Sequence, residues 1–597
     1  MGSRPAARAT LAAGSVYLVL GVAVWWHAWS GGPGHAIATG SLDPGQNVWW
    51  LAWVPHALGQ PTNPFFTRAM FWPDGVNVIA NTSFLLIGLL LSPVTLLFGP
   101  VTAFTVAVTL APAADALATF AAVRRYVSWA PAAFVGGLLY GFGPFVATDL
   151  RYGHLNLTAL VFPPLLLLLL DRLLFRPRRL FEHHATPWAL VLATAGLLVA
   201  EFFVSTEMLA LGVITAAVGV AVALLAWRRH LVERGRTIAV SLIAALALSV
   251  AALAYPVWWY LAGPRHFTGA VWQDMARFSA SLASFVRPHG QLFGTGFISG
   301  GNGDYLGIGL LLVLVIGLAI CRHQPILRFA VGMAAVTALL SLGPSLHVGE
   351  HDTGIVLPAW PLLHLPLVDS VAPSRFGAFT DLFCALALAV VLDRSRAALV
   401  GRAGGWAALR RSSRGGRSWA GLAPTIVPAA LAAAALVPLA VAQPWPYPVQ
   451  QLRQPTVLRA LARLPEGSVV REYPLVSGTN ATGLVWQATA GLRYAATGGY
   501  AIAPGTDGRA AIQPPDDALG LVFAGIALDK VRPPYAPSLV DDVRIHAWDR
   551  HAVAIAVVRG DRHAADVASL LRQALGPPSL ADASGWLWRR PTHSATR

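Results

Sequence analysis

One acidic residue stands out in the first polar stretch of the chain because a cluster of tryptophans follows it. Asp43 lies within residues 40–81, in the segment GSLDPGQNVWWLAW, ahead of Trp49, Trp50 and Trp53. The stretch has too many polar, proline and glycine residues to cross a bilayer. Aromatic residues favour the headgroup level, so we expect short helices along the membrane surface. A carboxylate there can act as a general base, or it can simply cap a helix that starts near residue 45.

A second candidate acid follows three apolar runs later, in the segment TDLRYGH. Asp149 stands close to Arg151 and His154 in this segment. If Asp149 and Asp43 converge on one cleft that faces the lipid, they form a pair able to abstract a proton or to bind a metal ion. Arg151 and His154 are then candidate substrate-binding residues. In the alternative interpretation, Asp149 only makes a surface ion pair with Arg151.

Further charged residues lie close to the expected outer membrane surface. Glu201 is a candidate substrate-binding residue because an acid near the membrane is costly unless it is paired or hydrated. Glu207 is expected to sit above the hydrocarbon boundary. Five arginines are expected on the outer side: Arg68, Arg265, Arg277, Arg287 and Arg375. Guanidinium groups match phosphate oxygens, so this set can bind a lipid phosphate, with Arg375 and Arg68 as the candidates.

The elements that must position these residues are membrane-spanning helices. Of the 597 residues, 55% are hydrophobic and only 12% are charged, which is far from the balance of a soluble protein. The formal charge of +15 and the isoelectric point near 10.6 come mostly from arginine clusters between apolar runs. The positive-inside rule explains such clusters, so we expect no nucleic-acid partner.

Apolar runs and arginine clusters together predict a polytopic α-helical protein with about eleven transmembrane helices in the plasma membrane. The segment 83–98 is expected not to cross, because only then do all the arginine clusters face the cytoplasm. The first span is expected to be retained, with a cytoplasmic N-terminus. The outer loops are then 30–82, 147–156, 263–304 and 344–376. The expected spans are about 11–29, 101–123, 131–146, 157–171, 187–205, 207–227, 237–262, 305–320, 327–343, 377–392 and 421–441.

The composition changes after the transmembrane domain, 1–441. A proline-rich linker begins at Pro444, and short β-branched runs follow at 468–472 and 552–558. Residues 564–575 have a helical pattern. We therefore expect residues 442–597 to form a soluble α/β domain on the extracytoplasmic side.

The order of these parts resembles the GT-C class of membrane glycosyltransferases. The matching positions are Asp43 in GSLDPGQNVWWLAW and Asp149 in TDLRYGH, and the resemblance covers about residues 1–441. The C-terminal stretch, with WQATAGLRYAATGGY after REYPLV, looks like the tail domain of bacterial proteins of this type. Pro44 stands where many members carry a second charged residue, so metal dependence is left open.

The resemblance implies transfer of a sugar from a polyprenyl-phosphate donor to an envelope acceptor, which is a glycan, a lipid or a protein. It implies that Asp43 is the general base of an inverting displacement. Asp149 would orient the site or help to hold a divalent metal ion, Mg²⁺ or Mn²⁺. An outer-loop arginine such as Arg375 would hold the departing lipid phosphate.

Two other classes of function remain open from the residues. A transporter or flippase of a lipid-linked substrate needs polar residues at mid-membrane, and Asp115 is the one clear candidate. A non-catalytic envelope protein that binds a glycan through its C-terminal domain predicts no shared cavity at Asp43 and Asp149. The separation of these two carboxylates therefore distinguishes the alternatives.

Overall fold

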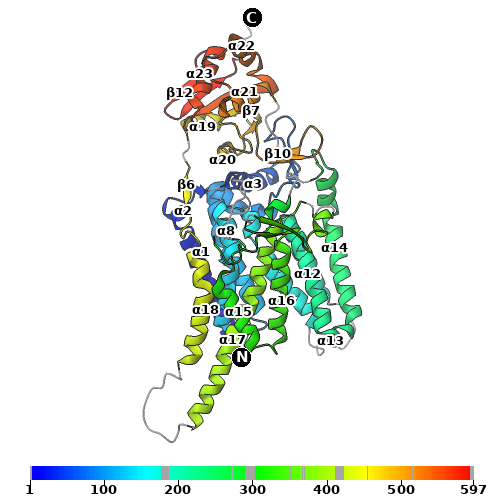
Figure 1. Cartoon of the computed structure of the whole chain (residues 1–597). Helices are drawn as coiled ribbons and strands as arrows, with labels where there is room; N and C mark the ends of the chain where they lie inside the picture. Colours follow the sequence, from blue (N-terminus) through cyan, green and yellow to red (C-terminus); the bar gives the residue numbers. More distant parts are fainter. Residues whose placement is uncertain are drawn as a thin grey trace.

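The computed structural model describes residues 3–39, 41–175, 187–269, 275–288, 303–349, 351–365, 368, 370–409, 422–452, 455–512 and 517–591. The arginines at 176–179 and 410–417, which helped to set the expected topology, lie outside these residues. Figure 1 shows a long helical bundle with a sheet-containing domain at one end, and α1 begins at the opposite end. The expected helical membrane protein with a C-terminal α/β part is confirmed.

Seven of the described helices are long and apolar enough to cross a membrane. They are α1 (Ser3–Val24), α6 (Pro100–Val123), α10 (Phe162–Phe175, entered through the short α9, Leu155–Thr158), α12 (Thr206–Ala226), α14 (Gly235–Ala262), α17 (Gly377–Leu409) and α18 (Ala423–Val441). An eighth span is possible if the bent pair α7 (Ala130–Gly141) and α8 (Pro144–Tyr152) counts as one. The chain is therefore a multi-pass membrane protein.

The three remaining expected spans fold as shorter apolar helices. They are α11 (Trp188–Phe202), α15 (Gly307–Ile320) and α16 (Pro325–Ser341), with 15, 14 and 17 residues. A full crossing takes roughly 20 helical residues. Length thus supports seven or eight of the eleven expected crossings in the described chain. The short α13 (Arg228–Val232) joins α12 to α14 at the end of the bundle away from the sheet (Figure 1).

The segment 83–98 forms two short helices instead of one span. α4 (Leu85–Leu90) and α5 (Ser92–Phe98) have six and seven residues, and Pro93 lies in the first turn of the second. Leu90 and Leu97 are exposed. An exposed apolar side on helices too short to cross fits a position in the membrane interface.

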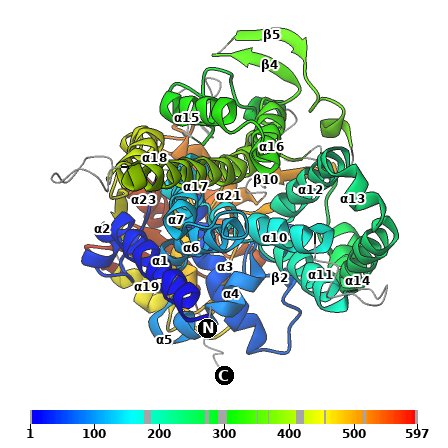
Figure 2. The ribbon, with the colours of Figure 1, turned by 90° about the horizontal axis from the view of Figure 1, so that it is seen from below.

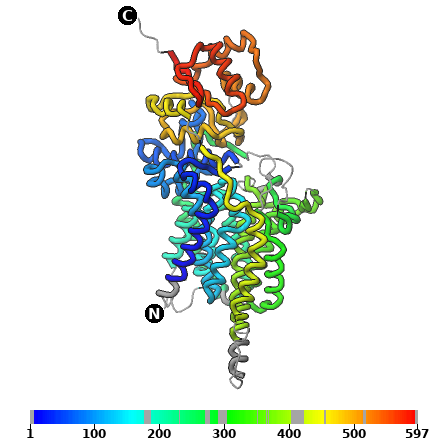
Figure 3. Tube along the Cα trace, turned by 90° about the vertical axis from the view of Figure 1, so that its left-hand side faces the viewer, coloured from blue at the N-terminus to red at the C-terminus, as the bar shows by residue number. Residues whose placement is uncertain are grey.

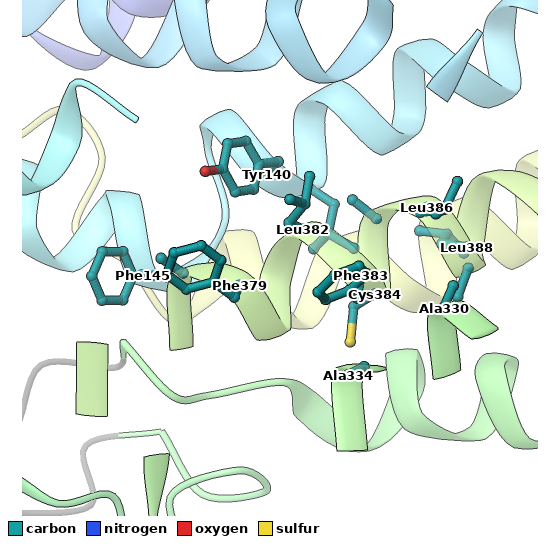
Figure 4. Packing of buried hydrophobic residues seen from close by; sticks show 14 of the residues in the cluster. Tyr140, Phe145, Ala330, Ala334, Phe379, Leu382, Phe383, Cys384, Leu386 and Leu388 are labelled. Carbon is teal, nitrogen blue, oxygen red and sulfur yellow. The ribbon is translucent and has the colours of Figure 1, made fainter. Parts of the chain in front are cut away.

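Helix α17 is the centre of the bundle. The part of it that could cross the membrane is entirely buried, and Figure 2 shows it running between α7, α16 and α18. Gly136 on α7 allows this approach, since a Cβ there would come 3.1 Å from the carbonyl oxygen of Ala385. Small residues let membrane helices pack closely by van der Waals contact. Figure 4 shows the larger side chains that fill the surrounding space, among them Tyr140, Phe379 and Phe383.

The segment between α1 and α6 is built around a buried helix, α3 (Asp43–Leu58). Trp49 and Trp50 are fully buried, and only 4% of Trp53 is exposed. A helix was expected here and one forms, but its tryptophans are buried inside the protein, where Trp49 contacts Gln487 of the C-terminal part. The smaller elements of this segment are α2 (Trp26–Ser30), β1 (Ala36–Ala38), β2 (Phe66–Thr67) and β3 (Val76–Asn77).

Two further connecting segments follow α14 and α16. They contain the 3₁₀ turns η2 (Met275–Phe278), η3 (Leu362–His364) and η4 (Pro373–Phe376) and the hairpin β4 (Ser345–Val348) and β5 (His351–Val356). The turn η4 leads directly into α17.

The C-terminal part contains a five-stranded sheet in the order β12–β13–β11–β7–β8. Strands β7 and β11 are parallel and match the expected runs, and α23 matches the expected helix. The elements are β6 (Val449–Gln451), α19 (Thr456–Leu461), β7 (Ser468–Tyr473), α20 (Thr482–Thr489), β8 (Tyr494–Ala496), β9 (Ile502–Pro504), β10 (Ala510–Ile512), α21 (Ala518–Ala527), α22 (Pro537–His546), η7 (Asp549–His551), β11 (Ala552–Val558), α23 (Ala564–Leu575), β12 (Leu580–Asp582) and β13 (Gly585–Arg589).

This part is docked firmly on the outer segment near α3. Strand β6 pairs with β1, and α20 packs on α3 (Figure 3). Gln487 on α20 is fully buried; its Oε1 accepts from Trp49 Nε1 at 2.5 Å, and its amide donates to the carbonyls of Ala69 and Tyr494. A buried polar group is tolerated when its hydrogen bonds are made, so Gln487 ties the two segments together at a fixed position.

Candidate functional site

Asp43 lies at the first turn of α3, where the helix N-terminus favours a negative charge. Its backbone N–H donates to Ser41 Oγ at 3.2 Å, and that hydroxyl donates to the carbonyl of Tyr152 at 2.8 Å. Asn47 on the next turn donates to the carbonyl of Gly153 at 2.6 Å. These bonds hold the start of α3 against the end of α8.

Asp149 lies on α8, and the turn that ends this helix brings His154 back over it. Gly153 ends α8 in the left-handed conformation, with φ of 72°, a common helix stop. The next residue, His154, then faces Asp149, and its Nδ1 lies 2.8 Å from Asp149 Oδ1. The short turn thus converts a sequence separation of five residues into a direct contact.

His154 joins the two acids. Its Nε2 lies 3.4 Å from Asp43 Oδ2, while its Nδ1 contacts Asp149. Burial lowers the pKa of His154, but its hydrogen bond to Asp149 and the charges of both carboxylates outweigh this effect and raise the pKa above the usual 6.5. The carboxylates of Asp43 and Asp149 therefore flank one imidazole that tends to carry a positive charge.

Replacing Gly153 by alanine is expected to destabilise the protein by about 2–4 kcal/mol. The left-handed φ is unfavourable for alanine, and the added Cβ would lie 2.7 Å from Pro44 Cγ and 3.1 Å from Ala38 Cβ. Thermal unfolding in detergent measures the loss. Gly196→Ala is the matched control, since a Cβ at Gly196 meets nothing within 4 Å. Equal melting temperatures for the two variants would contradict the close approach of α3 to this turn.

The stability that His154 contributes is expected to depend on pH. Its folded pKa exceeds 6.5, so the charged contacts are complete below pH 6.5 and are lost as pH rises through the folded pKa. The difference in melting temperature between wild type and His154→Gln should be largest below pH 6.5 and shrink toward alkaline pH. A difference that stays constant from pH 5.5 to 9 would show that the imidazole is not charged between the two acids.

Arg375 lies in η4, just before α17, and pairs with Glu207 at the start of α12. Glu207 also accepts from the backbone N–H of Ala372 at 2.9 Å, which fixes its position. The charge of Arg375 acts on His154, where it opposes protonation. Arg375 thus belongs to the surroundings of the two acids. Glu207, which was expected only to lie above the hydrocarbon boundary, holds this arginine.

The other predicted residues lie in different surroundings. Arg151 is half-buried and lies over the ring of Tyr152, with 5.7 Å from its Cζ to the ring centroid. Among the described ion pairs, Asp149 pairs with His154 and not with Arg151. Arg68 is exposed and lies over Phe66. Glu201 is buried inside the bundle, and no described contact links it to Asp43, Asp149 or His154. The structure therefore brings together Asp43, Asp149, His154 and Arg375.

One further residue of the site comes from the C-terminal part. The Tyr500 hydroxyl donates to Asp43 Oδ1 at 3.0 Å, and Gln46 on α3 donates to the Tyr500 carbonyl at 2.6 Å. Tyr500 was not among the predicted residues. The sequence signal next to Tyr500 is Gly498-Gly499, which indicates that the backbone packs closely against a neighbour. It does not indicate that Tyr500 contacts Asp43.

The arrangement of the acids does not match a divalent metal site. Among the described residues, no three His, Cys, Asp or Glu side chains are grouped as metal ligands. His154 lies between the two carboxylates, and Tyr500 occupies the other oxygen of Asp43. We therefore derive no chemical step through a metal ion.

An apolar cavity of about 290 Å³ lies deeper in the bundle, between α10, α12, α16 and α17. It is lined mainly by leucine, alanine and aromatic residues, and Asp43, Asp149 and His154 do not line it. Phe379 on α17 lines the cavity and lies one helical turn after Arg375. The cavity therefore begins close to the arginine of the site.

Several solved structures are similar to this chain. The Archaeoglobus fulgidus oligosaccharyltransferase with a tethered acceptor peptide matches over 95% of this chain and 71% of its own, with a TM-score of 0.45 and 11% identity. Apo ArnT from Cupriavidus metallidurans matches over 96% of this chain and 97% of its own, with a TM-score of 0.42 and 13% identity. The mycobacterial arabinofuranosyltransferase AftD matches over 92% of this chain and 36% of its own, with a TM-score of 0.44 and 15% identity.

These neighbours are GT-C glycosyltransferases. Other structures of the first two proteins contain dolichol-phosphate or zinc and sulfate in the archaeal enzyme and undecaprenyl phosphate in ArnT. No protein-family profile and no curated protein sequence matches this chain.

Proposed function

We propose that this protein transfers a sugar from a polyprenyl-phosphate donor to an envelope acceptor on the extracytoplasmic side of the membrane. The observation that carries the proposal is the convergence of Asp43 and Asp149 on His154, beside Arg375, at the outer end of the bundle. This convergence favours an enzyme and not a non-catalytic glycan-binding protein. Two acids and an arginine close together provide both a base and a site for an anion.

Asp43 is the general base of the proposed reaction. The acceptor hydroxyl gives its proton to Asp43 as its oxygen bonds to the anomeric carbon of the sugar. The bond from that carbon to the lipid phosphate oxygen breaks at the same time, and its electron pair leaves with the phosphate. A single displacement of this kind inverts the anomeric centre. About a third of the Asp43 side chain is exposed, which leaves room for the acceptor hydroxyl.

Asp149 orients the base through His154. The charged imidazole donates from Nδ1 to Asp149 Oδ1 and faces Asp43 Oδ2 with Nε2. This arrangement fixes the imidazole between the two acids. Asp149 is therefore assigned a positioning role, with Asp43 as the residue that meets the acceptor.

Arg375 is assigned to the leaving phosphate. A guanidinium offers several N–H donors in a planar fork, so it can bind phosphate oxygens while it keeps one bond to Glu207. The apolar cavity that begins one turn farther along α17 is suited to hydrocarbon. A donor with a phosphate at Arg375 and its isoprenoid chain among these helices matches both environments.

The arginine distribution supports an extracytoplasmic site. Described arginines gather at the helix ends away from Asp43, namely Arg124, Arg125, Arg172, Arg228, Arg229, Arg234, Arg236, Arg394 and Arg396. Cytoplasmic loops carry such an excess of arginine. The site and the C-terminal part then face outward.

The proposal can be tested in cells that lack this protein. We expect glycosylated polyprenyl phosphate to accumulate and one sugar to be missing from the envelope, as measured by mass spectrometry of lipid extracts and by glycan analysis. The wild-type gene should restore both, and Asp43→Asn should restore neither. Full restoration by Asp43→Asn would overturn the enzyme assignment in favour of a transporter or a binding protein.

A further inference from the structure

Tyr500 reaches Asp43 from 457 positions away in the sequence, so the candidate site is shared by two distant parts of the chain. The hydroxyl of Tyr500 lies 3.0 Å from Asp43 Oδ1, and the opposite oxygen, Oδ2, faces His154. Each carboxylate oxygen therefore has its own partner. A carboxylate held at both oxygens keeps one orientation about its side-chain bonds.

The backbone that carries Tyr500 is fixed on both sides. Asn81 binds Ile502 twice, since its amide donates to the Ile502 carbonyl at 2.9 Å and its Oδ1 accepts from the Ile502 N–H at 2.7 Å. Three more hydrogen bonds hold residues 498–500. The carbonyl of Gly498 accepts from the N–H of Phe71, and the N–H of Gly499 donates to the carbonyl of Val476. The carbonyl of Tyr500 accepts from the side-chain amide of Gln46. The tyrosine is thus presented by a rigid segment and not by a mobile flap.

Gly499 shows how closely this segment lies against the outer loop. A Cβ at this position would come 2.7 Å from the ring of Phe71, so only glycine fits without a shift. This contact explains why a glycine precedes Tyr500 in the stretch YAATGGY. The same close approach holds the backbone beside Tyr500 against the segment that contains Phe71.

Tyr500 acts toward Asp43 only as a donor. Burial raises the pKa of its phenol, and the charge of Asp43 and the hydrogen bond to it raise it further. The hydroxyl therefore keeps its proton at physiological pH. Tyr500 cannot compete with Asp43 as a base, and its effect on the reaction must pass through the carboxylate.

We propose that Tyr500 is a positioning residue for Asp43, so that the C-terminal segment 498–502 forms an integral wall of the transfer site. This inference rests on the proposed function, because it assigns Tyr500 to the base of that reaction. The tyrosine and His154 hold the carboxylate from opposite sides and leave its exposed part for the acceptor hydroxyl. The C-terminal part then acts as a component of catalysis as well as a cover for the tryptophans of α3.

The variant Tyr500→Phe removes only the hydroxyl and is expected to lower kcat about 10-fold, with the KM of the donor within about twofold. The loss should fall on kcat and leave the KM of the acceptor within about twofold as well, because the hydroxyl holds the base and touches neither substrate. Tyr473→Phe is the matched control, because the Tyr473 hydroxyl donates to Asp561 Oδ1 at 2.9 Å in the sheet. Its kcat and both KM values should match those of the wild type.

A second measurement does not depend on sugar transfer. A water-soluble carbodiimide with glycine ethyl ester labels carboxyl groups that it can reach, and peptide mass spectrometry reports the rate at which Asp43 is labelled at one fixed pH. Asp43 should be labelled faster in Tyr500→Phe, where one of its oxygens has lost its partner, and at the wild-type rate in Tyr473→Phe. An unchanged labelling rate and an unchanged kcat in Tyr500→Phe would overturn the positioning role. A wild type that transfers no more sugar than Asp43→Asn while the labelling rate still rises would overturn the proposed function alone.

Discussion

Replacing Asp43 by asparagine is expected to reduce sugar transfer about 1000-fold, with little change in the KM of the donor. A positioned general base contributes roughly 100- to 10,000-fold to a rate, and the amide of asparagine cannot accept the proton of the acceptor. The amide oxygen of asparagine can still accept a hydrogen bond from the Tyr500 hydroxyl, so the shape of the site should be kept. Steady-state rates with donor and acceptor varied separately measure the effect.

The matched control for this prediction is Asp74→Asn. Asp74 is an exposed acid in the same outer segment, so the substitution removes the same charge from the same side of the membrane. We expect its rate to stay within about twofold of the wild type, as for most surface substitutions. Equal losses in the two variants would mean that the outer negative charge, and not the base at Asp43, controls the rate.

Replacing Arg375 by alanine is expected to lower kcat/KM for the lipid donor about 10- to 100-fold. A hydrogen bond to a charged group contributes about 1.5–3 kcal/mol, and each 1.36 kcal/mol corresponds to a factor of ten in rate. Arg375→Lys should recover only part of the loss, because an ammonium lacks the planar fork of donors. Initial rates over a range of donor concentrations measure both variants.

Glu207→Gln separates phosphate binding from structural pairing at Arg375. The glutamine can still accept from the N–H of Ala372, but it removes the charge that pairs with the arginine. If Arg375 binds the phosphate, Glu207→Gln should bind the donor at least as tightly as the wild type. If the arginine only supports the fold through its ion pair, both substitutions should lower kcat/KM and the melting temperature alike.

Apolar runs and arginine clusters were sufficient to predict the membrane part, since spanning length and loop charge are local properties of the sequence. All eleven expected ranges contain a helix, although α11, α15 and α16 are shorter than a full span. The strands at β7 and β11 were also predictable from their β-branched residues. The burial of the tryptophans was not predictable. Aromatic residues suit the headgroup region and a buried contact equally well, and the cover comes from the distant helix α20.

The candidate site was predictable only in part. Asp43 and Asp149 could be singled out because each is an acid beside the end of an apolar run. The bridging role of His154 depends on the left-handed turn at Gly153, and the hold on Arg375 depends on the packing of α12 against η4. Tyr500 carries no local signal at all, since its partner is set by the docking of the C-terminal part. Contacts that depend on tertiary packing cannot be predicted from local spacing.

The most direct test of the account is transfer by the purified full-length protein in lipid vesicles that contain polyprenyl-phosphate-linked sugars, with envelope acceptor added. Release of polyprenyl phosphate and formation of the glycosylated acceptor are measured together. The account predicts equal amounts of the two products, inversion at the anomeric carbon and loss of both products in Asp43→Asn. Movement of the intact lipid-linked sugar across the vesicle membrane without either product would contradict it.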